Sequence, residues 1–303
     1  MNKRLKIYLF ALLSMLFWGF SFVWVKVVYA HGYQPIMTIF IRLVLSSAIL
    51  FIFSKIMKKD QKIDKKDYGK FILLALFQPF FYFLGESFAL QSNNFSSTIA
   101  SVIISTIPLI TPFFSYIFIK EKVTLLNFIG FVVSFAGILM MVVEPDFSLS
   151  ASPLAVMLEF SAVFSAIFYS LVVKKLTHKY SAFTIIKWQN ILGAIYFLPL
   201  FIIFDFNQFI SIKPDSELIF SMLMLSIFAS SGAYLLYIPV VRELGINKSN
   251  IFTNFIPVFT AITSYFVLSE TFSFIKIAGM TVVIAGIVIA QIYTKRKTNL
   301  NRI

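Results

Sequence analysis

The stretch Ile107-Pro-Leu-Ile-Thr-Pro-Phe-Phe-Ser-Tyr-Ile-Phe-Ile-Lys-Glu121 recurs later in the chain as Ile256-Pro-Val-Phe-Thr-Ala-Ile-Thr-Ser-Tyr-Phe-Val-Leu-Ser-Glu270. The two copies are separated by a constant offset of 149 residues, and the ungapped agreement extends over about thirty residues. Such a match indicates an internal repeat. It predicts two halves, residues 1–148 and 149–303. Identities at this offset pair Pro108 with Pro257, Thr111 with Thr260, Ser115 with Ser264, Tyr116 with Tyr265, Glu121 with Glu270, Gly130 with Gly279 and Gly137 with Gly286.

Both halves are too apolar for a water-soluble protein. The chain is 59% hydrophobic and 13% charged, whereas a soluble domain carries roughly a quarter charged residues. The apolar runs lack the two-residue alternation of barrel strands, so we expect spanning helices. The predicted fold is an all-α integral membrane protein with ten transmembrane helices. The runs lie at residues 7–29, 34–56, 70–90, 97–119, 125–143, 153–173, 183–204, 218–240, 246–268 and 273–293.

The basic residues fix the expected orientation. If both termini lie in the cytoplasm, all but four of the 26 Lys and Arg residues fall on the inner side of the membrane. The four are Lys213 and Lys276 outside, and Lys26 and Arg42 within spans. This bias predicts a multi-pass protein of the bacterial inner (plasma) membrane with cytoplasmic N- and C-termini. Because each half holds an odd number of spans, the second half is inserted upside down, and such inverted repeats are a transporter architecture.

Composition also argues against several kinds of function. The chain has no cysteine, and its histidines, His31 and His178, fall in predicted loops, so we expect no metal site and no cofactor. The basic residues form short clusters between apolar runs, which argues against nucleic acid as a partner. A Gly-x-x-x-x-Gly-Lys sequence is missing, so ATP is not expected as the direct energy source. An enzyme is not expected.

Four charged residues fall inside predicted spans, where each costs about 2.5–3.5 kcal/mol on insertion scales. They all lie in the outer third of the membrane, and their charges cancel. We hypothesise a paired extracellular cluster that acts in gating or coupling, or that binds one end of a zwitterion. Structural ion pairing is the alternative, with Lys26 extending to the headgroups. The four residues are Lys26, Arg42, Glu86 and Glu159.

Polar and aromatic residues inside spans predict a substrate cavity. Gln78, Tyr82 and Glu86 follow one another at helical spacing in the third predicted span, and helix packing is the alternative reading for small polar residues. The expected cavity residues are Trp18, Arg42, Gln78, Tyr82, Glu86, Asn190, Tyr234, Tyr237 and Asn254.

Repeat-paired residues suggest structural roles. Pro108 and Pro257 interrupt backbone hydrogen bonding near mid-span, which predicts hinges for alternating access or simple bends. Glu121 and Glu270 end predicted spans in both halves. We expect a structural contact there, such as capping of the next helix.

A family resemblance rests on three features: Trp18-Gly19 near the start, Pro35 followed by Arg42, and a Pro…Glu…Gly…Gly block present in both halves. The chain resembles EamA-type members of the drug/metabolite transporter superfamily along nearly its whole length. Ile167 and Ser170 replace the Trp-Gly pattern in the second half. The resemblance implies ten spans in two five-span repeats, and movement of small metabolites, often export of amino acids, through a central cavity.

Together these features predict a secondary transporter of small polar metabolites that exports amino acids or related compounds by alternating access. Its expected partners are a small-molecule substrate and membrane lipid. A lipid or lipid-carrier flippase of the same fold, with a cavity open sideways, is the alternative. Substrate identity, transport direction, coupling ion and oligomeric state stay open, a monomer included.

Overall fold

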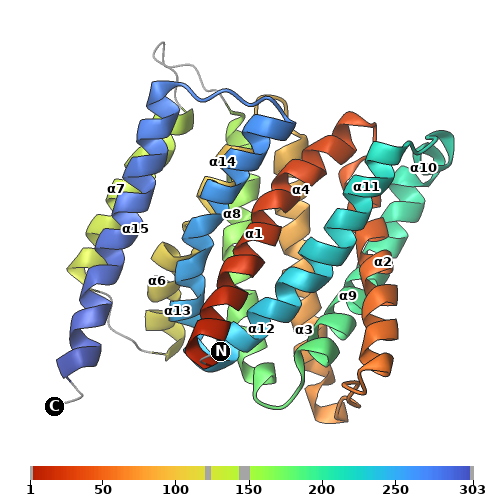
Figure 1. Ribbon diagram of the computed structural model, residues 1–303, viewed down its shortest axis with the longest axis horizontal. Helices are drawn as coiled ribbons and strands as arrows, with labels where there is room; N and C mark the ends of the chain where they lie inside the picture. The colour runs from red at the N-terminus through yellow and green to blue at the C-terminus, as the bar shows by residue number, and fades with distance from the viewer. Residues whose placement is uncertain (1–2, 120–123, 143–150, 301–303) are drawn as a thin grey trace.

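The computed structural model describes residues 3–119, 124–142 and 151–300, which form a helical bundle without β-strands in those ranges (Figure 1). The predicted boundary after residue 148 falls outside the described residues, as does Glu121. The α-helices are α1 (Lys3–Ala30), α2 (Pro35–Ile56), α3 (Tyr68–Ala75), α4 (Tyr82–Gln91), α5 (Ser97–Ile104), α6 (Ile107–Ile119), α7 (Leu125–Val142), α8 (Pro153–Thr177), α9 (Ala182–Leu200), α10 (Phe206–Ser211), α11 (Ser216–Met224), α12 (Ala233–Leu244), α13 (Ile246–Asn250), α14 (Ile256–Val267) and α15 (Phe274–Leu300). Short 3-10 or π segments join some of them: η1 (Lys65–Asp67), η2 (Leu76–Phe81), η3 (Phe201–Asp205), η4 (Leu225–Gly232) and η5 (Ile251–Phe255).

Eight helical segments in the described ranges are long and apolar enough to cross a membrane. α7 and α15 contribute shorter apolar stretches, Leu125–Met141 and Phe274–Ile289. The structure therefore supports eight of the ten expected spans, and crossing by α7 and α15 stays a prediction. The eight segments are Lys3–Ala30, Pro35–Ile56, Lys65–Gln91, Ser97–Phe114, Pro153–Thr177, Ala182–Ser211, Ser216–Leu244 and Ile246–Val267.

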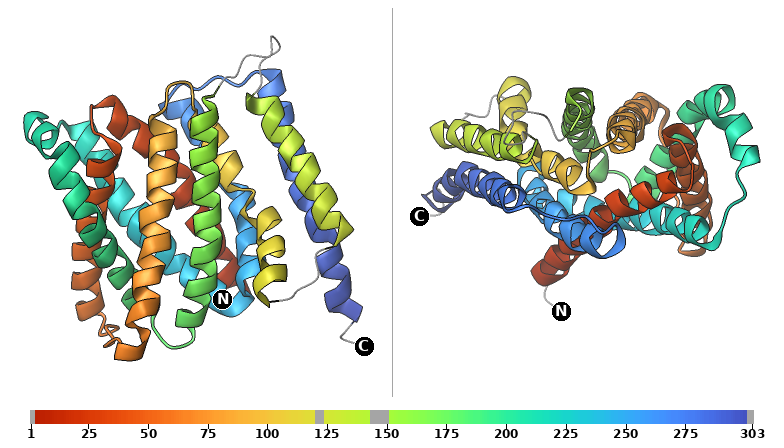
Figure 2. Two further views of the ribbon diagram at one scale, coloured as in Figure 1. Left: turned by 180° about the vertical axis from the view of Figure 1, so that it is seen from behind. Right: turned by 90° about the horizontal axis from the view of Figure 1, so that it is seen from above.

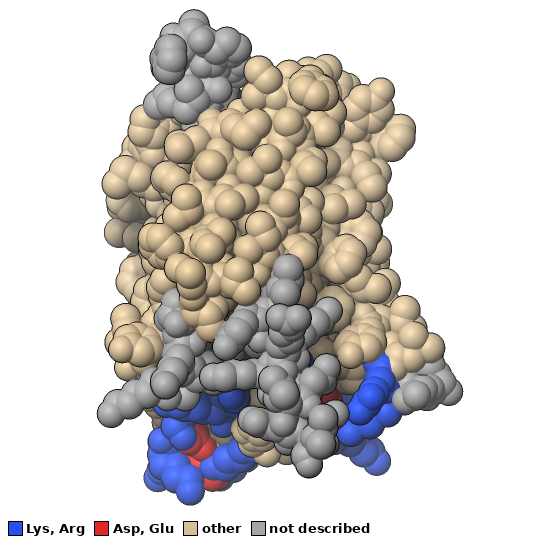
Figure 3. Space-filling model, turned by 90° about the vertical axis from the view of Figure 1, so that its left-hand side faces the viewer, with Lys and Arg blue, Asp and Glu red and all other residues tan. Residues whose placement is uncertain are grey.

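The bundle has one strongly basic end. α1 begins and α15 ends at the lower edge of Figure 1, as an even number of crossings requires. On the face drawn in Figure 3, the charged side chains gather at this same end and the broad band above them is uncharged. A wide uncharged band between polar ends is what a bilayer requires of the surface that it contacts. We call this end the basic end.

Helix breaks occur at equivalent places in the two halves. α5 and α13 begin 149 residues apart, and so do α6 and α14. Pro108 and Pro257 are each the second residue of the later helix. A proline is tolerated there because its missing N–H would have no helical partner, whereas the helix cannot continue unbroken through it. The structure thus places both prolines at broken-helix junctions, and their hinge role stays a prediction.

α7 and α15 pack against each other through the glycines of the repeat, and they stand side by side in both figures (Figures 1 and 2). A Cβ atom built on Gly137 would lie 2.7 Å from the Gly279 carbonyl oxygen, and one on Gly286 would lie 2.6 Å from that of Gly130. Because Gly130 meets Gly286 and Gly137 meets Gly279, the two helices are antiparallel. The first helices of the halves, α1 and α8, also run in opposite directions in Figure 2.

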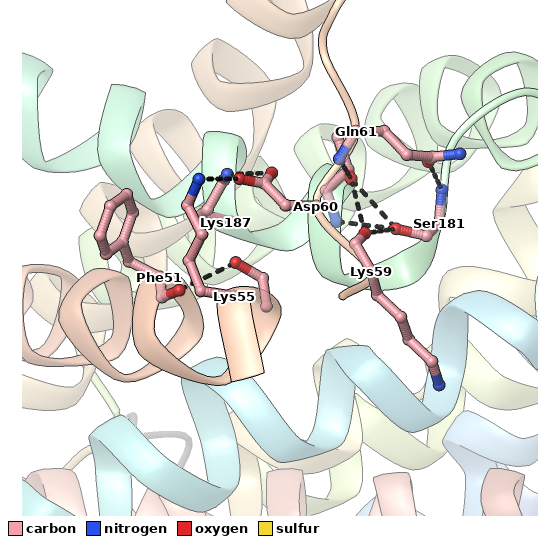
Figure 4. Close-up of polar contacts among 9 residues, drawn as sticks. Phe51, Lys55, Lys59, Asp60, Gln61, Ser181 and Lys187 are labelled. Carbon is pink, nitrogen blue, oxygen red and sulfur yellow. Dashed lines mark hydrogen bonds and ion pairs between the residues drawn. The ribbon is translucent and has the colours of Figure 1, made fainter. Parts of the chain in front are cut away.

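Residues 57–64, between α2 and η1, bind the turn between α8 and α9 at the basic end (Figure 4). The Lys187 ammonium pairs with Asp60 and is almost fully buried. The Ser181 hydroxyl donates to the Lys59 carbonyl at 2.9 Å, and the Gln61 N–H donates to Thr184 Oγ1 at 3.1 Å. This segment therefore ties the first half to the second.

Glu270 caps a helix, but not the one expected. Its carboxylate accepts from the Ser97 N–H at 3.0 Å and from the Thr98 hydroxyl at 2.9 Å. These groups begin α5, where a carboxylate also meets the positive end of the helix dipole. The expectation of capping the next helix, α15, is wrong, because residue 270 instead lies against the other half of the chain.

We predict that Asp60→Asn lowers the free energy of unfolding by roughly 1–3 kcal/mol, because Lys187 then keeps a buried charge without its carboxylate. The hydrogen bond from Lys187 holds the pKa of Asp60 below its ordinary value. The stabilisation is therefore complete above about pH 4 and is lost as pH falls through the lower folded-state pKa. Apparent Tm in detergent at several pH values measures this. Asp64→Asn, at a more exposed carboxylate, is the control and should change stability by less than about 1 kcal/mol.

We also predict that Gly286→Ala destabilises the protein by roughly 1–3 kcal/mol, because the new methyl would lie 2.3 Å from the Ser134 Oγ. Gly137→Ala should act in the same direction. Gly69→Ala is the matched control, since a Cβ there meets nothing within 4 Å and alanine favours a helix. Equal apparent Tm values for the Gly286 and Gly69 variants would show that α7 and α15 do not pack in this way.

Candidate functional site

A cavity of about 50 Å³ lies between helices of both halves. Its wall combines one cation, one carboxylate and several aromatic rings with apolar residues. By comparison, sites for drug-sized ligands enclose about 300–1,000 Å³, so this cavity holds a few waters and little more. The lining residues are Trp18, Ser21, Phe22, Arg42, Gln78, Tyr82, Phe83, Glu86, Ile104, Ile107, Ala166, Tyr169, Ser170, Tyr234, Tyr237, Asn250, Thr253 and Ile256.

Arg42 is the cation of this wall, and only 2% of it is exposed. Its Nε donates to the Ser230 hydroxyl at 2.8 Å, and its guanidinium lies 4.2 Å from the centre of the Phe83 ring. Its Nη1 is buried and has no hydrogen-bond partner among the described residues. A buried guanidinium with an unbonded N–H can bind an anion, because its planar fork of N–H donors matches the two oxygens of a carboxylate.

The support for Arg42 comes from a second layer of polar groups. Asn190 Nδ2 donates to the Ser46 hydroxyl at 2.6 Å and to the Ser230 carbonyl at 3.0 Å. Ser46 and Ser231 share a further hydrogen bond of 2.6 Å. The expectation that Asn190 faces the cavity is therefore wrong: its amide is used in holding η4, which carries Ser230, against α2.

Glu86 is the carboxylate of the wall, and 4% of it is exposed. The Tyr82 hydroxyl donates to Glu86 Oε1 at 2.8 Å. Among acidic residues, Glu86 exerts the strongest electrostatic attraction on Arg42, although these two described residues form no direct ion pair. Each charge therefore keeps bonding capacity on the cavity side.

Gln78 reaches the cavity through a break in its helix. Its backbone is non-helical, with φ −143° and ψ 115°, and it precedes Pro79. Its side-chain amide donates to the Tyr234 hydroxyl. The regular i, i+4, i+8 stack expected for Gln78, Tyr82 and Glu86 is interrupted here, yet all three residues line the cavity.

An aromatic cluster closes one side of the cavity. Trp18 packs edge-on against Tyr234 and Tyr237, with ring centres 5.0 and 5.1 Å apart. The Tyr237 hydroxyl donates to Asn250 Oδ1 at 2.7 Å. The Asn250 amide donates in turn to the Thr111 hydroxyl at 3.3 Å. Seven of the nine expected cavity residues thus lie together in the wall, and substrate contact by them stays a prediction.

The remaining expected residues lie elsewhere. Asn254 is half-buried in η5 outside the wall, and its Oδ1 has no hydrogen-bond partner in the part of the chain that the structure describes. Lys26 does not join the charge cluster as expected, because the acidic group that acts on it is Glu270. Glu159 does lie near the cluster, and Glu86 is the charged group that acts on it. Glu159 is fully buried, and within the described ranges neither of its oxygens has a hydrogen-bond partner.

Several lining residues were missed from the sequence, among them Tyr169 and Thr253. The repeat offset is a signal for Thr253, but not for Tyr169, whose equivalent, Phe20, does not line the cavity. Three pairs of lining residues are separated by 149 positions: Ser21 with Ser170, Ile104 with Thr253, and Ile107 with Ile256.

We predict that Ser230→Ala lowers the free energy of unfolding by roughly 1.5–3 kcal/mol, because it removes the acceptor of a buried guanidinium N–H. Ser226→Ala is the matched control, since that buried hydroxyl bonds only to its own helix, to the Met222 carbonyl at 2.7 Å. Apparent Tm values of the two variants in one detergent provide the comparison. A loss no larger for Ser230→Ala than for Ser226→Ala would contradict the anchoring of Arg42.

Comparisons with known proteins agree with this architecture. The EamA-like transporter family matches twice, over residues 5–143 and 153–291. A protein of Archaeoglobus fulgidus named as an uncharacterized transporter is 27% identical over 282 residues, 91% of this chain and 95% of that protein. The uncharacterized transporter YetK of Bacillus subtilis is 25% identical over 84% of this chain and 77% of its own. A solved crystal structure shares the fold, with a TM-score of 0.69 and 13% identity over 96% of this chain and 98% of the other. The two family matches cover nearly the whole chain, which therefore belongs to the EamA-like transporter family and, through it, to the drug/metabolite transporter superfamily.

Proposed function

We propose that this membrane transporter is a secondary exporter of small polar metabolites, amino acids or related zwitterions in particular. The observation that carries the proposal is that Arg42, with an unbonded N–H donor, and Glu86 line the same aromatic-walled cavity. A substrate carboxylate suits the guanidinium, and a substrate ammonium suits Glu86. The rings of Trp18, Tyr234 and Tyr237 offer apolar surface to the part of the substrate between its carboxylate and its ammonium.

Alternating access between two inverted repeats accounts for the geometry of the cavity. A cavity of about 50 Å³ cannot admit an amino acid without helix movement. The antiparallel α7 and α15, and the equivalent breaks before Pro108 and Pro257, provide a pseudo-symmetric frame for that movement. In this proposal the protein lies in a bacterial inner membrane with its basic end facing the cytoplasm. A monomer holds a complete site.

One observation favours the alternative, a lipid or lipid-carrier flippase. An open groove of about 540 Å³ runs between η2, α4 and α8. Its wall is almost wholly apolar, as an acyl chain would require. The residues that line it are Phe77, Phe81, Leu84, Gly85, Phe88, Leu158, Ser161, Ser165 and Phe168.

A proteoliposome assay tests the proposal. Vesicles holding the protein are offered pooled amino acids and other small polar metabolites, and the retained compounds are read by mass spectrometry against empty vesicles. We predict saturable accumulation of one zwitterionic class, reduced roughly tenfold or more by Arg42→Lys, because a charge-assisted bond is lost. Glu86→Gln should act similarly.

Glu217→Gln is the control for Glu86→Gln, because this carboxylate is exposed at the end opposite the basic end. Full transport by Glu86→Gln at normal abundance would rule out its role in the site. If folded protein retains none of the pool but moves a fluorescent lipid between leaflets, the flippase reading replaces the exporter.

A further inference from the structure

We infer that Glu159 is a proton-binding site coupled to transport, an inference that rests on the proposed transporter function. Glu159 lies on α8 with none of its surface exposed, and neither carboxylate oxygen has a hydrogen-bond partner in the described structure. An ionised carboxylate in that position would carry a charge with nothing to balance it, which proteins avoid by keeping the group neutral. Glu159 therefore holds a proton in this conformation.

The neighbours of Glu159 support the neutral form. Glu86 from α4 is the charged group that acts on it, and it is an anion rather than a cation. Tyr82, also from α4, interacts electrostatically with both carboxyl groups, but its hydroxyl donates its hydrogen bond to Glu86. Arg42 is the cation that acts on Glu86, so Arg42, an ionised Glu86 and a protonated Glu159 are together neutral.

Among the described residues, the other elements packed on α8 do not offer Glu159 a counter-charge. α5 and η2 carry no ionisable side chain. α12 contributes Tyr234 and Tyr237, which act on Tyr169 of α8. The remaining ionisable residues of these helices are exposed or engaged elsewhere, and they are Tyr68 and Lys70 of α3, Tyr116 of α6, Lys187 and Tyr196 of α9, Arg242 and Glu243 of α12, and Lys248 of α13.

Glu86 connects this proton to the cavity. It lines the cavity wall, whereas Glu159 lies behind the wall, and α4 and α8 approach so closely that a Cβ on Gly85 would lie 2.5 Å from the Leu158 carbonyl oxygen. When α4 moves against α8, the proton leaves the Glu159 carboxyl oxygen for the Glu86 carboxylate and passes from there to cavity water. Return of a proton from the other side of the membrane restores neutral Glu159, so each cycle of export exchanges substrate for a proton.

Infrared difference spectroscopy of the full-length protein in nanodiscs tests the proton directly, without any transport assay. At neutral pH the wild type should show the C=O stretch of a protonated carboxyl group. Glu159→Gln should remove this band, and Glu217→Gln should leave it in place. If Glu159→Gln does not fold, Glu159→Asp serves instead, because its carboxyl band should shift in frequency. A band that is absent in the wild type, or unaltered in the Glu159 variants, overturns the inference.

Coupling is tested in proteoliposomes with the pooled amino acids, with and without a proton gradient. The wild-type rate should depend on the gradient, and in Glu159→Gln the two rates should become equal. A gradient effect that persists in Glu159→Gln overturns the coupling. If the wild type moves none of the pool, the proposed exporter function fails, whereas the infrared band still decides whether Glu159 holds a proton.

Discussion

The site depends on one constraint: the Arg42 guanidinium is buried inside an apolar bundle and must be held by other groups. Ser230 from η4 accepts its Nε–H, Phe83 from α4 covers its face, and Glu86 supplies the opposite charge. Asn190 in turn ties α2, which carries Arg42, to η4, which carries Ser230. Arg42 and Glu86 belong to the first half of the chain, and Ser230 and Asn190 belong to the second. The contacts around the Arg42 guanidinium therefore fix the position of one half relative to the other.

The two halves share a frame but not a chemistry. The helix breaks, the glycine contacts of α7 with α15, and three pairs of lining residues all obey the 149-residue offset. The chemical groups do not: the positions equivalent to Arg42 and Glu86 are Ile191 and Leu235. Under the proposed alternating access, a symmetric frame would give two openings of similar energy, and charges contributed by one half only would give the substrate one orientation.

The sequence predicts those features of the structure whose physical causes act within a single segment. Burial of apolar runs and the cost of an intramembrane charge act on single segments, so the spans and the placement of Arg42 and Glu86 in the wall were predictable. Which groups contact one another across helices depends on the tertiary structure. Glu270 caps α5 rather than α15 because the halves interlock, and Asn254 fails to reach the cavity because η5 turns its helix. Helical spacing alone carries no information about either event.

In the proposed alternating access, opening toward the basic end would separate the contacts of residues 57–64 with the turn between α8 and α9. Most of these contacts are exposed ion pairs or single hydrogen bonds, each worth about 1 kcal/mol or less. The Asp60–Lys187 pair differs, because Lys187 is buried and separation would leave its charge without a partner until water enters. An opening of the cavity at this end would therefore have to bring water to this pair.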